Sequence, residues 1–296
     1  MKLVRSKTLA AAAVLTLSLA ACGDAGEDEG GSDTPDVEVD AEAEFEAGTT
    51  MAELQEAGSI TIGVKYDQPG VGFLPAGAED PEGFDIEMGK VIAAGLGIAE
   101  DDIEWTETIS DNREPFLQNG EVDIVLASYS ITDDRREVVG QAGPYYVTGQ
   151  QLLVASDDDT IGGPDDLEGQ EVCSVTGSTS IETVEVEYGA TPRGFDTYSE
   201  CTDQLLNGQV DAVTTDGAIL LGYAAENPDE LKVVGEEFSE ERYGIGYELG
   251  DTAFCEFIQE TITAAQEDGV WEEAFVATLG ISDVETPEPP AMDECL

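Results

Sequence analysis

An internal repeat is the feature that most constrains how this chain can fold. Residues 117–125 (LQNGEVDIV) and 205–213 (LLNGQVDAV) share six of nine positions at an offset of 88 residues. In each copy, Asn-Gly is typical of the end of a helix and Val-Asp of the start of a strand. The repeat therefore predicts two α/β lobes of similar design. The same offset places Ser128 opposite Asp216, just after the equivalent strands.

Strand and helix patterns alternate from residue 51 onward. The expected strands cover residues 59–64, 103–109, 122–127, 151–155, 171–175, 211–214 and 231–234. Helical periodicity is clear over residues 85–96 and over 252–279, where Gly269 is expected to separate two helices. This alternation predicts α/β layers with largely parallel sheets. Since such sheets bind ligands beyond the carboxyl ends of their strands, we expect a cleft between the lobes, with Ser128 and Asp216 in it.

The charge of the chain excludes several kinds of function. There are 66 acidic and 11 basic residues, which give a formal net charge of -55, and there is no histidine. Such a chain repels phosphate backbones and cannot assemble a basic stripe, so we expect no nucleic-acid partner. Without histidine, histidine metal sites and Ser-His-Asp triads are excluded, and we expect no metal and no cofactor. Salt screens repulsion between surface carboxylates, which favours a salty or extracellular habitat.

The first 21 residues have the pattern of an export signal. Three cations within residues 2–7 precede an apolar run of about 13 residues, which is too short to span a membrane. The Leu-Ala-Ala-Cys tetrapeptide that ends at Cys22 resembles the lipobox of bacterial lipoproteins. This resemblance implies lipid on Cys22 and anchoring to the outer face of the cell membrane. A plain signal peptide with an incidental cysteine is the alternative.

Residues 22–50 are expected to form a flexible acidic tether. Residues 23–48 contain eleven acidic residues and no basic ones, a composition that repels itself and cannot bury a core. Three of the 11 cations lie in the export signal. An anionic ligand would have to be bound by some of the other eight, namely Lys65, Lys90, Arg113, Arg135, Arg136, Arg193, Lys232 and Arg242.

Four cysteines remain once Cys22 is assigned to lipid, and an oxidising compartment favours disulfides. They permit three pairings, of which we favour the one between neighbours, Cys173 with Cys201 and Cys255 with Cys295. Each disulfide would close a loop of roughly 30 to 40 residues and stabilise the fold by about 3 to 4 kcal/mol. Four free buried thiols are the alternative, and the wide spacing argues against a metal site.

Two motifs resemble a known family. Residues 83–88 (GFDIEM) and 128–136 (SYSITDDRR, followed by GPYY) resemble signatures of the bacterial extracellular solute-binding proteins of the polar amino-acid class, family 3. The resemblance implies a two-lobed, periplasmic-binding-protein-like (type II) fold with two hinge crossovers and a ligand cleft. The first lobe would take residues 51–147 and 244–296, and the second lobe residues 148–243.

The resemblance assigns the ligand's α-carboxylate to Arg135, helped by Ser128 and Ser130. A guanidinium group suits this role because it forms paired, charge-assisted hydrogen bonds with a carboxylate. A surface ion pair with Asp133 or Asp134 is the alternative for Arg135.

The second lobe is expected to complete the site. Residues 175–180 (VTGSTS) resemble the family's loop that meets the same carboxylate, which implies roles for Gly177, Ser178 and Thr179 at a helix N-terminus. Asp216 matches the carboxylate that receives the α-ammonium. A simple turn and a helix N-cap are the alternatives for the loop and for Asp216.

The ligand's side chain is expected to meet cations. Residues 112–120 (NREPFLQNG) resemble the segment whose arginine holds a distal carboxylate in acidic amino-acid binders, which implies that role for Arg113. Residues 63–67 (GVKYD) resemble the start of glutamate-binding lipoproteins of actinobacterial type, where Lys65 would assist. We expect Tyr66 or Phe73 to pack on the ligand's aliphatic part. An exposed helix position for Arg113 and a core position for Tyr66 are the alternatives.

These features predict the monomeric, lipid-anchored binding protein of an ABC amino-acid importer. It would close on glutamate and deliver it to the permease subunits, with aspartate and glutamine as alternative ligands. An enzyme on the same scaffold, such as a dehydratase with Asp216 as general acid, is a second class of function. A sensory ligand-binding module is a third. We expect binding rather than catalysis, because the sequence offers no second catalytic group.

Overall fold

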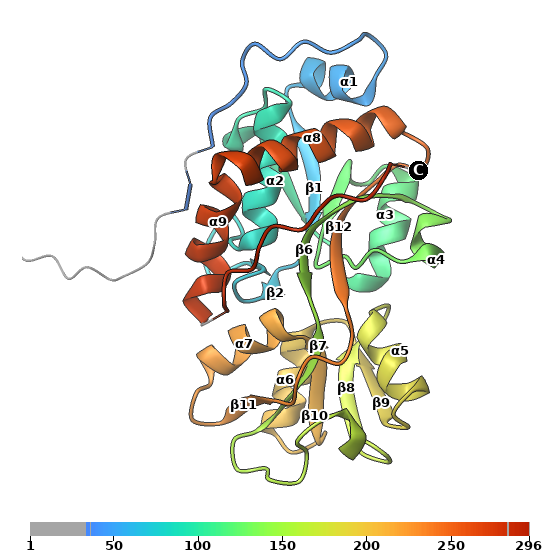
Figure 1. Cartoon of the computed structure of the whole chain (residues 1–296), viewed down its shortest axis with the longest axis vertical. Coiled ribbons are helices and arrows are strands. Elements are labelled where there is room, and N and C mark those ends of the chain that lie inside the picture. The colour runs from blue at the N-terminus through green and yellow to red at the C-terminus, as the bar shows by residue number, and fades with distance from the viewer. Residues whose placement is uncertain (1–33, 36, 283, 296) are drawn as a thin grey trace, which may run out of the picture. The chain divides into compact units, whose positions relative to one another are not determined.

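The computed structural model describes residues 34, 35, 37–282 and 284–295, and two five-stranded sheets form its framework (Figure 1). The first sheet has the order β4 (Ile103–Glu107), β1 (Ile60–Val64), β5 (Ile124–Leu126), β12 (Glu241–Tyr247) and β6 (Gly140–Thr148). The second has the order β11 (Leu231–Val234), β7 (Gln150–Ala155), β10 (Ala212–Asp216), β8 (Glu171–Val175) and β9 (Thr191–Phe195). A short hairpin pairs β2 (Asp67–Gln68) with β3 (Gly72–Phe73).

Both sheets mix parallel and antiparallel strands. In the first, β1 is parallel to β4 and β5, whereas β12 is antiparallel to β5 and β6. In the second, β8 is parallel to β9 and β10, whereas β7 is antiparallel to β10 and β11. The chain enters the second sheet between β6 and β7 and returns between β11 and β12. We call the parts built on these sheets the first lobe and the second lobe, and the expected two-lobed α/β class is confirmed.

Helices cover both sheets. The first lobe carries α1 (Thr50–Ala57), α2 (Phe84–Gly95), α3 (Arg113–Asn119), α4 (Asp133–Arg136), α8 (Thr252–Asp268) and α9 (Val270–Thr278). The second carries α5 (Thr179–Val186), α6 (Tyr198–Leu206) and α7 (Gly217–Glu226). Gly269, with a φ of 87°, separates α8 from α9 as expected. In the described part of the chain, no helix combines the length and the apolar character of a membrane span.

The internal repeat marks equivalent units of the two lobes. Helix α3 is followed by Gly120 and α6 by Asn207 and Gly208, and the two glycines have φ values of 66° and 64°. Each turn leads into a central strand, β5 or β10. The helix–turn–strand units read from the sequence are therefore present in both lobes.

Strands β6, β9 and β12 lie outside the expected set. All three contain glycine, and β6 and β9 also contain proline, residues that usually indicate turns. In β12 the glycines make room for neighbours, because a Cβ on Gly246 would lie 3.0 Å from the Tyr129 ring and one on Gly244 would lie 2.6 Å from the Ile131 side chain. Tertiary packing, rather than local preference, keeps these segments extended.

The core of the first lobe positions the loop that contains Ser128. The ring of Phe84, the first residue of α2, lies 5.5 Å from that of Trp271, whose Nε1 donates to Tyr145 O at 2.8 Å. All three are buried, and each such burial contributes about 1.5 to 3 kcal/mol. Next to Phe84, the Asp85 carboxylate accepts hydrogen bonds from Tyr145 OH at 2.6 Å and from Ser128 N at 2.7 Å. The core thus holds Ser128 in place.

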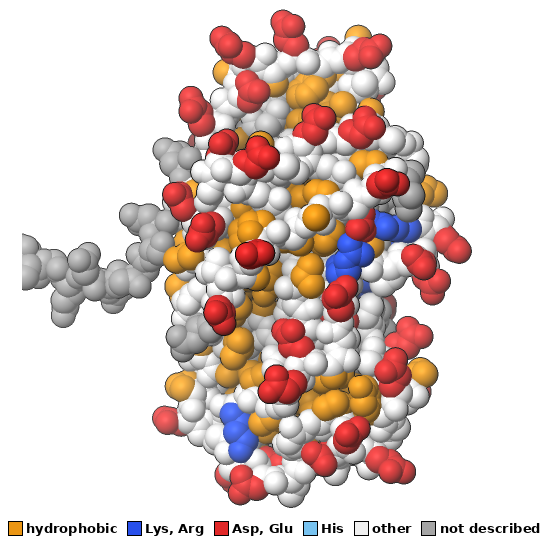
Figure 2. All heavy atoms as spheres, viewed as in Figure 1, with side chains coloured by type: hydrophobic (Ala, Val, Ile, Leu, Met, Phe, Trp, Pro, Cys, Tyr) orange, Lys and Arg blue, Asp and Glu red, His pale blue; other side chains and the backbone are white. Residues whose placement is uncertain are grey.

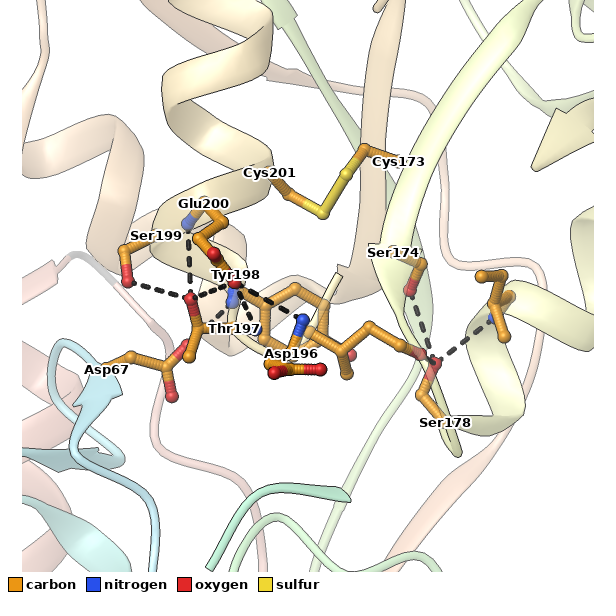
Figure 3. Close-up of a disulfide and its surroundings, with 12 residues drawn as sticks. Asp67, Cys173, Ser174, Ser178, Asp196, Thr197, Tyr198, Ser199, Glu200 and Cys201 are labelled. Atoms are coloured by element: carbon orange, nitrogen blue, oxygen red, sulfur yellow. Dashed lines mark hydrogen bonds between the residues drawn. A yellow bond between two sulfur atoms is a disulfide. The ribbon is translucent and has the colours of Figure 1, made fainter. Parts of the chain in front are cut away.

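Two disulfides are present, in the pairing that we favoured. Cys173 of β8 is bonded to Cys201 of α6, 28 residues along the chain (Figure 3). Cys255 of α8 is bonded to Cys295 in the C-terminal tail, 40 residues along the chain. The first disulfide therefore lies within the second lobe, and the second holds the tail on the first lobe.

The C-terminal tail is also held by ion pairs. The Asp293 carboxylate accepts hydrogen bonds from Arg136 Nη2 at 2.9 Å and from Arg242 Nη2 at 2.5 Å. These contacts lower the pKa of Asp293 despite its partial burial. Asp293 N donates to Gly143 O at 2.7 Å. The tail thereby connects α4 with the crossover strands β6 and β12.

The N-terminal segment differs from the expected tether. The expected export signal at residues 1–21, Cys22 and the expected tether up to residue 33 lie outside the described residues. Further along, Asp40 N donates to Ala94 O at 3.0 Å, and the ring of Phe45 lies 5.5 Å from that of Phe257 in α8. Val37 also packs against the core. These apolar residues attach residues 37–45 to the first lobe although the segment is acidic.

Candidate functional site

A polar cleft lies between the two lobes. Its cavity volume is only about 10 Å³, about the space of one water molecule, so the two lobes lie tightly against each other there. The first lobe contributes Ser110, Arg113, Ser128, Ser130 and Arg135. The second lobe contributes Ser178, Thr179, Ser180, Tyr198, Thr215 and Asp216.

Arg113 begins α3 and is only 2% exposed. Its guanidinium group donates from Nε to Ser110 O at 3.1 Å, from Nη1 to the carbonyls of Ala127 and Ser128, and from Nη2 to Gly177 O at 3.0 Å. Since arginine has five N–H groups, one on Nη2 has no partner among the described residues. Burial, followed by the charge of Arg135, lowers the pKa of Arg113 to about 10. Arg113 is therefore not an exposed helix residue, which was the alternative to a binding role.

Arg135 lies beside Arg113, near the end of α4. Its Nη1 donates to Ser130 O at 2.7 Å and its Nη2 to Gly177 O at 3.0 Å, so both arginines share the Gly177 carbonyl. The guanidinium groups of Arg113 and Arg135 lie 4.6 and 4.9 Å from the centre of the Tyr129 ring. The ion-pair partner of Arg135 is Glu114, at 3.4 Å, rather than a neighbouring aspartate.

Lys65 follows β1 and is 2% exposed. Its Nζ donates to Ser110 Oγ at 2.9 Å. Burial, followed by the charge of Arg113, lowers the pKa of Lys65 to about 7. Lys65 does not line the cleft itself, but it contacts Ser110, which lines the cleft beside Arg113 and Arg135.

The structure corrects the expectation for Tyr66, which does not line the cleft. Its side chain is partly buried and its hydroxyl donates to Trp105 O in β4, at 3.1 Å. Successive side chains along an extended chain point to opposite sides, so Lys65 points toward Ser110, a residue of the cleft, and Tyr66 points toward β4.

Ser128 and Gly177 both have positive φ values, and the loop of Gly177 lies close to the first lobe. Ser128, just beyond β5, has a φ of 43°, which is uncommon for a residue other than glycine. Gly177 has a φ of 79°, and a Cβ there would collide with Asp111 of the first lobe. Only glycine fits this approach, which brings its carbonyl to both arginines.

Ser178 caps α5, where its Oγ accepts from Ile181 N at 3.2 Å and donates to Val175 O at 2.8 Å. Thr179 is the first residue of this helix. The positive end of the helix dipole therefore faces the cleft, which favours an anion there.

Asp216 ends β10 and is 4% exposed. Its Oδ2 accepts a hydrogen bond from Tyr243 OH at 2.6 Å, and its side chain makes no capping hydrogen bond to α7. No Lys or Arg of the described residues forms an ion pair with it. Burial, followed by the charge of Glu241, raises the pKa of Asp216 to about 8. This carboxylate is suited to receive a cationic group.

Several residues around the cleft were not predicted from the sequence. Ser110 precedes Arg113 by three residues, Thr215 directly precedes Asp216, and Tyr198 belongs to no recognised motif. Glu241 accepts hydrogen bonds from Ser130 and Thr179 near the cleft. One carboxylate among 66 acidic residues gives no sequence signal.

The lobes also meet outside the cleft. Asp67 of β2 accepts a hydrogen bond at Oδ2 from Tyr198 N, at 2.6 Å, and at its carbonyl from Tyr223 OH. Figure 3 shows Asp67 beside the first turn of α6. Nearby, Gly222 of α7 lies against Pro69, where a Cβ would be 2.5 Å from Pro69 O. These contacts join the β2–β3 hairpin of the first lobe to α6 and α7 of the second lobe.

The outer surface contrasts with the cleft. Acidic side chains are spread over the face shown in Figure 2, and basic ones are few. Lys90, Arg193 and Lys232 each pair with a carboxylate of the described part of the protein. Within that part, no group of three or more Cys, Asp or Glu side chains is arranged to hold a metal ion.

The cleft combines donors for carboxylates with an acceptor for an ammonium group, and comparisons with known proteins agree with this chemistry. The family model described as bacterial extracellular solute-binding proteins, family 3, matches residues 60–277. The glutamate-binding protein GluB of Corynebacterium efficiens is 38% identical over 283 residues, which cover 91% of this chain and 88% of GluB. The ABC transporter glutamine-binding protein GlnH of Bacillus subtilis is 34% identical, covering 76% of this chain and 83% of GlnH.

A solved structure of an ancestral arginine-binding protein bound to glutamine superimposes with a TM-score of 0.70 at 35% identity. The match covers 75% of this chain and 98% of the ancestral protein. The family resemblance predicted from residues 83–88 and 128–136 is confirmed. The chain belongs to the bacterial extracellular solute-binding proteins, family 3.

Proposed function

We propose that this protein binds glutamate for an ABC importer. The observation that carries the proposal is that Arg113 and Arg135 line a cleft that also contains the Asp216 carboxylate, while Lys65 contacts Ser110 of the same cleft. Only eight Lys and Arg follow the expected export signal, so three of them in or beside one cleft is a large share. Glutamate has two carboxylates and one ammonium group, which match these charges. The names of the relatives GluB and GlnH support an amino acid of this size.

We assign the α-carboxylate of the ligand to Arg135. Ser128 and Ser130 of the first lobe and Gly177, Ser178 and Thr179 of the second would complete its binding. The ammonium group goes to Asp216. The contacts that support this division are the shared Gly177 carbonyl and the position of α5, whose N-terminus adjoins the arginines.

The distal carboxylate goes to Lys65 and Arg113. Both are buried, and Lys65 has only the neutral Ser110 hydroxyl as its hydrogen-bond partner among the described residues. A buried cation without a counter-charge is costly, and a ligand carboxylate removes that cost. The neutral amide of glutamine would not remove the cost of the buried charge, so the site favours glutamate. Aspartate has a shorter side chain and would reach one carboxylate site less well.

The remaining parts of the proposal concern delivery. Residues 1–21 would direct export, lipid on Cys22 would anchor a monomer to the outer face of the cell membrane, and permease subunits would receive the ligand. The lobes that close on it would comprise residues 51–147 with 244–296, and residues 148–243. We infer that the ligand is released unchanged, and chromatography of the ligand recovered after incubation tests for turnover.

Calorimetry with a panel of amino acids tests the ligand, on protein that begins at Gly23 and therefore lacks the export signal and Cys22. Glutamate should bind more tightly than glutamine, aspartate and arginine. The Lys65→Met and Arg113→Met variants should each weaken glutamate binding by at least about 30-fold, since removing one partner of a buried charge pair costs about 2 to 5 kcal/mol.

Arg193→Met is the matched control, because the Arg193 side chain is 52% exposed and pairs with Glu171 on the surface. It should bind glutamate as the unaltered protein does. Tighter binding of uncharged or cationic amino acids than of glutamate would refute the assignment of the side-chain site.

A further inference from the structure

Glu241 is a buried carboxylate that does not line the cleft. It is the first residue of β12, at the point where the chain returns from the second lobe to the first. Its side chain is held by hydroxyl groups. Oε2 accepts from Ser130 Oγ at 2.6 Å and from Thr179 Oγ1 at 2.9 Å, and Oε1 accepts from Ser239 Oγ at 2.9 Å.

One oxygen atom of Glu241 therefore joins the two lobes. Ser130 belongs to the first lobe and Thr179 to the second, and both side chains line the cleft. In this structure both hydroxyls reach Oε2, so the carboxylate links the two lobes directly. Hydrogen bonds to a charged acceptor are stronger than neutral ones, so this contact fixes two ligand-facing loops in one geometry.

The charge of Glu241 has no cationic partner in the described part of the protein. No Lys or Arg there lies within 4.0 Å of its carboxylate, and the adjacent Arg242 pairs with Asp293 instead. Hydroxyl groups satisfy the oxygen atoms without neutralising the charge. Burying a charge without a counter-charge has a desolvation cost, which a neutral residue of similar shape would avoid. The presence of a carboxylate therefore suggests a role for the charge itself.

Strand β12 also contacts Asp216. Tyr243, two residues after Glu241, donates its hydroxyl to Asp216 Oδ2 at 2.6 Å. The negative charge of Glu241 is the second cause, after burial, of the raised pKa of Asp216. The two carboxylates therefore repel each other in the closed cleft, and a cationic group bound at Asp216 relieves that repulsion.

We propose that Glu241 is a positioning residue, which aligns Ser130 and Thr179 across the closed cleft and favours ligands that bring an ammonium group to Asp216. The inference rests on the proposed function and extends it to a residue that does not touch the ligand. It also predicts a specific effect of pH, because Glu241 acts on the proton affinity of Asp216.

The other charged and titratable groups around Asp216 should not obscure the effect of Glu241 on its pKa. The charges of Arg113 and Arg135 lower its pKa, and Arg113, with a pKa of about 10, remains charged in the range of the experiment. Burial raises the pKa values of the surrounding tyrosines, so that they remain neutral, namely Tyr146, Tyr198 and Tyr243. Glu241 is therefore the neighbouring negative charge whose removal should lower the pKa of Asp216.

Calorimetry of the Glu241→Gln variant tests the proposal. Glutamine is the probe because its side chain is uncharged, so its binding does not depend on the charge of Lys65. In the unaltered protein, glutamine affinity should rise with pH up to about pH 8, as Asp216 loses its proton. In Glu241→Gln, affinity for glutamine and glutamate should fall by about tenfold, and the midpoint of the pH dependence should move to lower pH.

Two further variants separate charge from shape. Glu241→Asp keeps the charge and should retain the midpoint of the unaltered protein, even if its shorter side chain lowers the affinity. Glu240→Gln is the matched control, because the adjacent Glu240 side chain is 73% exposed, and it should change neither affinity nor midpoint. Thermal unfolding of each variant checks that it is folded.

The possible results separate this inference from the proposed function. If the unaltered protein binds no amino acid, both are overturned. If it binds, but folded Glu241→Gln keeps the original midpoint, the inference alone is overturned, because a purely structural role lowers affinity equally at every pH. A midpoint that also moves in Glu241→Asp would overturn it as well.

Discussion

The contact between Gly222 and Pro69 allows closure to be weakened without touching the ligand. A Cβ on Gly222 would lie 2.5 Å from Pro69 O, and the three nearest heavy atoms all belong to Pro69. The hairpin that carries Pro69 has little freedom to move, because Asp67 is bonded to Tyr198 and Tyr223. We therefore expect Gly222→Ala to act as a wedge against the closed arrangement. When the lobes separate, the added methyl group no longer meets Pro69.

The structure allows the size of this effect to be estimated. Overpacking a tight contact costs about 1 to 3 kcal/mol, here only in the closed state. Since the ligand binds the closed state, its dissociation constant should rise by about 5-fold to 150-fold. In α7 itself, alanine is more favourable than glycine by roughly 0.5 to 1 kcal/mol, so the second lobe should not lose stability.

Calorimetry with glutamate and glutamine measures the effect, and small-angle X-ray scattering at low ligand concentration measures closure. Both ligands should weaken by the same factor, because the wedge touches neither. Ala225→Gly, on the exposed side of the same helix, is the control for helix propensity and should leave affinity unchanged. An unchanged dissociation constant in Gly222→Ala, or a loss that differs between the ligands, would refute the reasoning.

Three further predictions concern pH and the tail. As pH rises from about 6 to about 9, glutamine affinity should increase more than glutamate affinity, because Asp216 becomes charged while Lys65, with a pKa of about 7, loses its charge; parallel curves in calorimetry would contradict this. Cys295→Ser should lower the free energy of unfolding by about 4 kcal/mol, measured with urea, because it opens a loop of 40 residues. Asp293→Asn should cost about 1 to 3 kcal/mol at neutral pH, and less as pH falls through the lowered pKa of Asp293, since protonation already removes the ion pairs of the unaltered protein.

The repeat predicted the parts of the fold that depend on local sequence. Asn-Gly ended the helices because glycine accepts a left-handed conformation, and the offset of 88 residues placed Ser128 and Asp216 in one cleft. Strands β6 and β12 could not be predicted in this way. Glycines such as Gly246 occur there because an aromatic ring packs against the strand, and that contact exists only in the folded chain.

The site shows a similar division. Residue type and motif singled out Arg113, Arg135 and Asp216, and the structure brings all three to one cleft. They could not predict that Arg113 and Arg135 donate to the same carbonyl of Gly177, since that contact joins the two lobes. Tyr66 was placed wrongly because the sequence alone did not show that its hydroxyl reaches β4.

The acidic exterior and the cationic cleft act on different steps of ligand exchange. An anionic ligand meets repulsion from the surface before it reaches the buried Lys65 and Arg113. Salt screens exposed charges over a Debye length of about 8 Å at physiological ionic strength, but it screens buried contacts much less. The association rate constant of glutamate should therefore increase with salt while its dissociation rate constant changes little. That is the reverse of the salt dependence usual for oppositely charged partners.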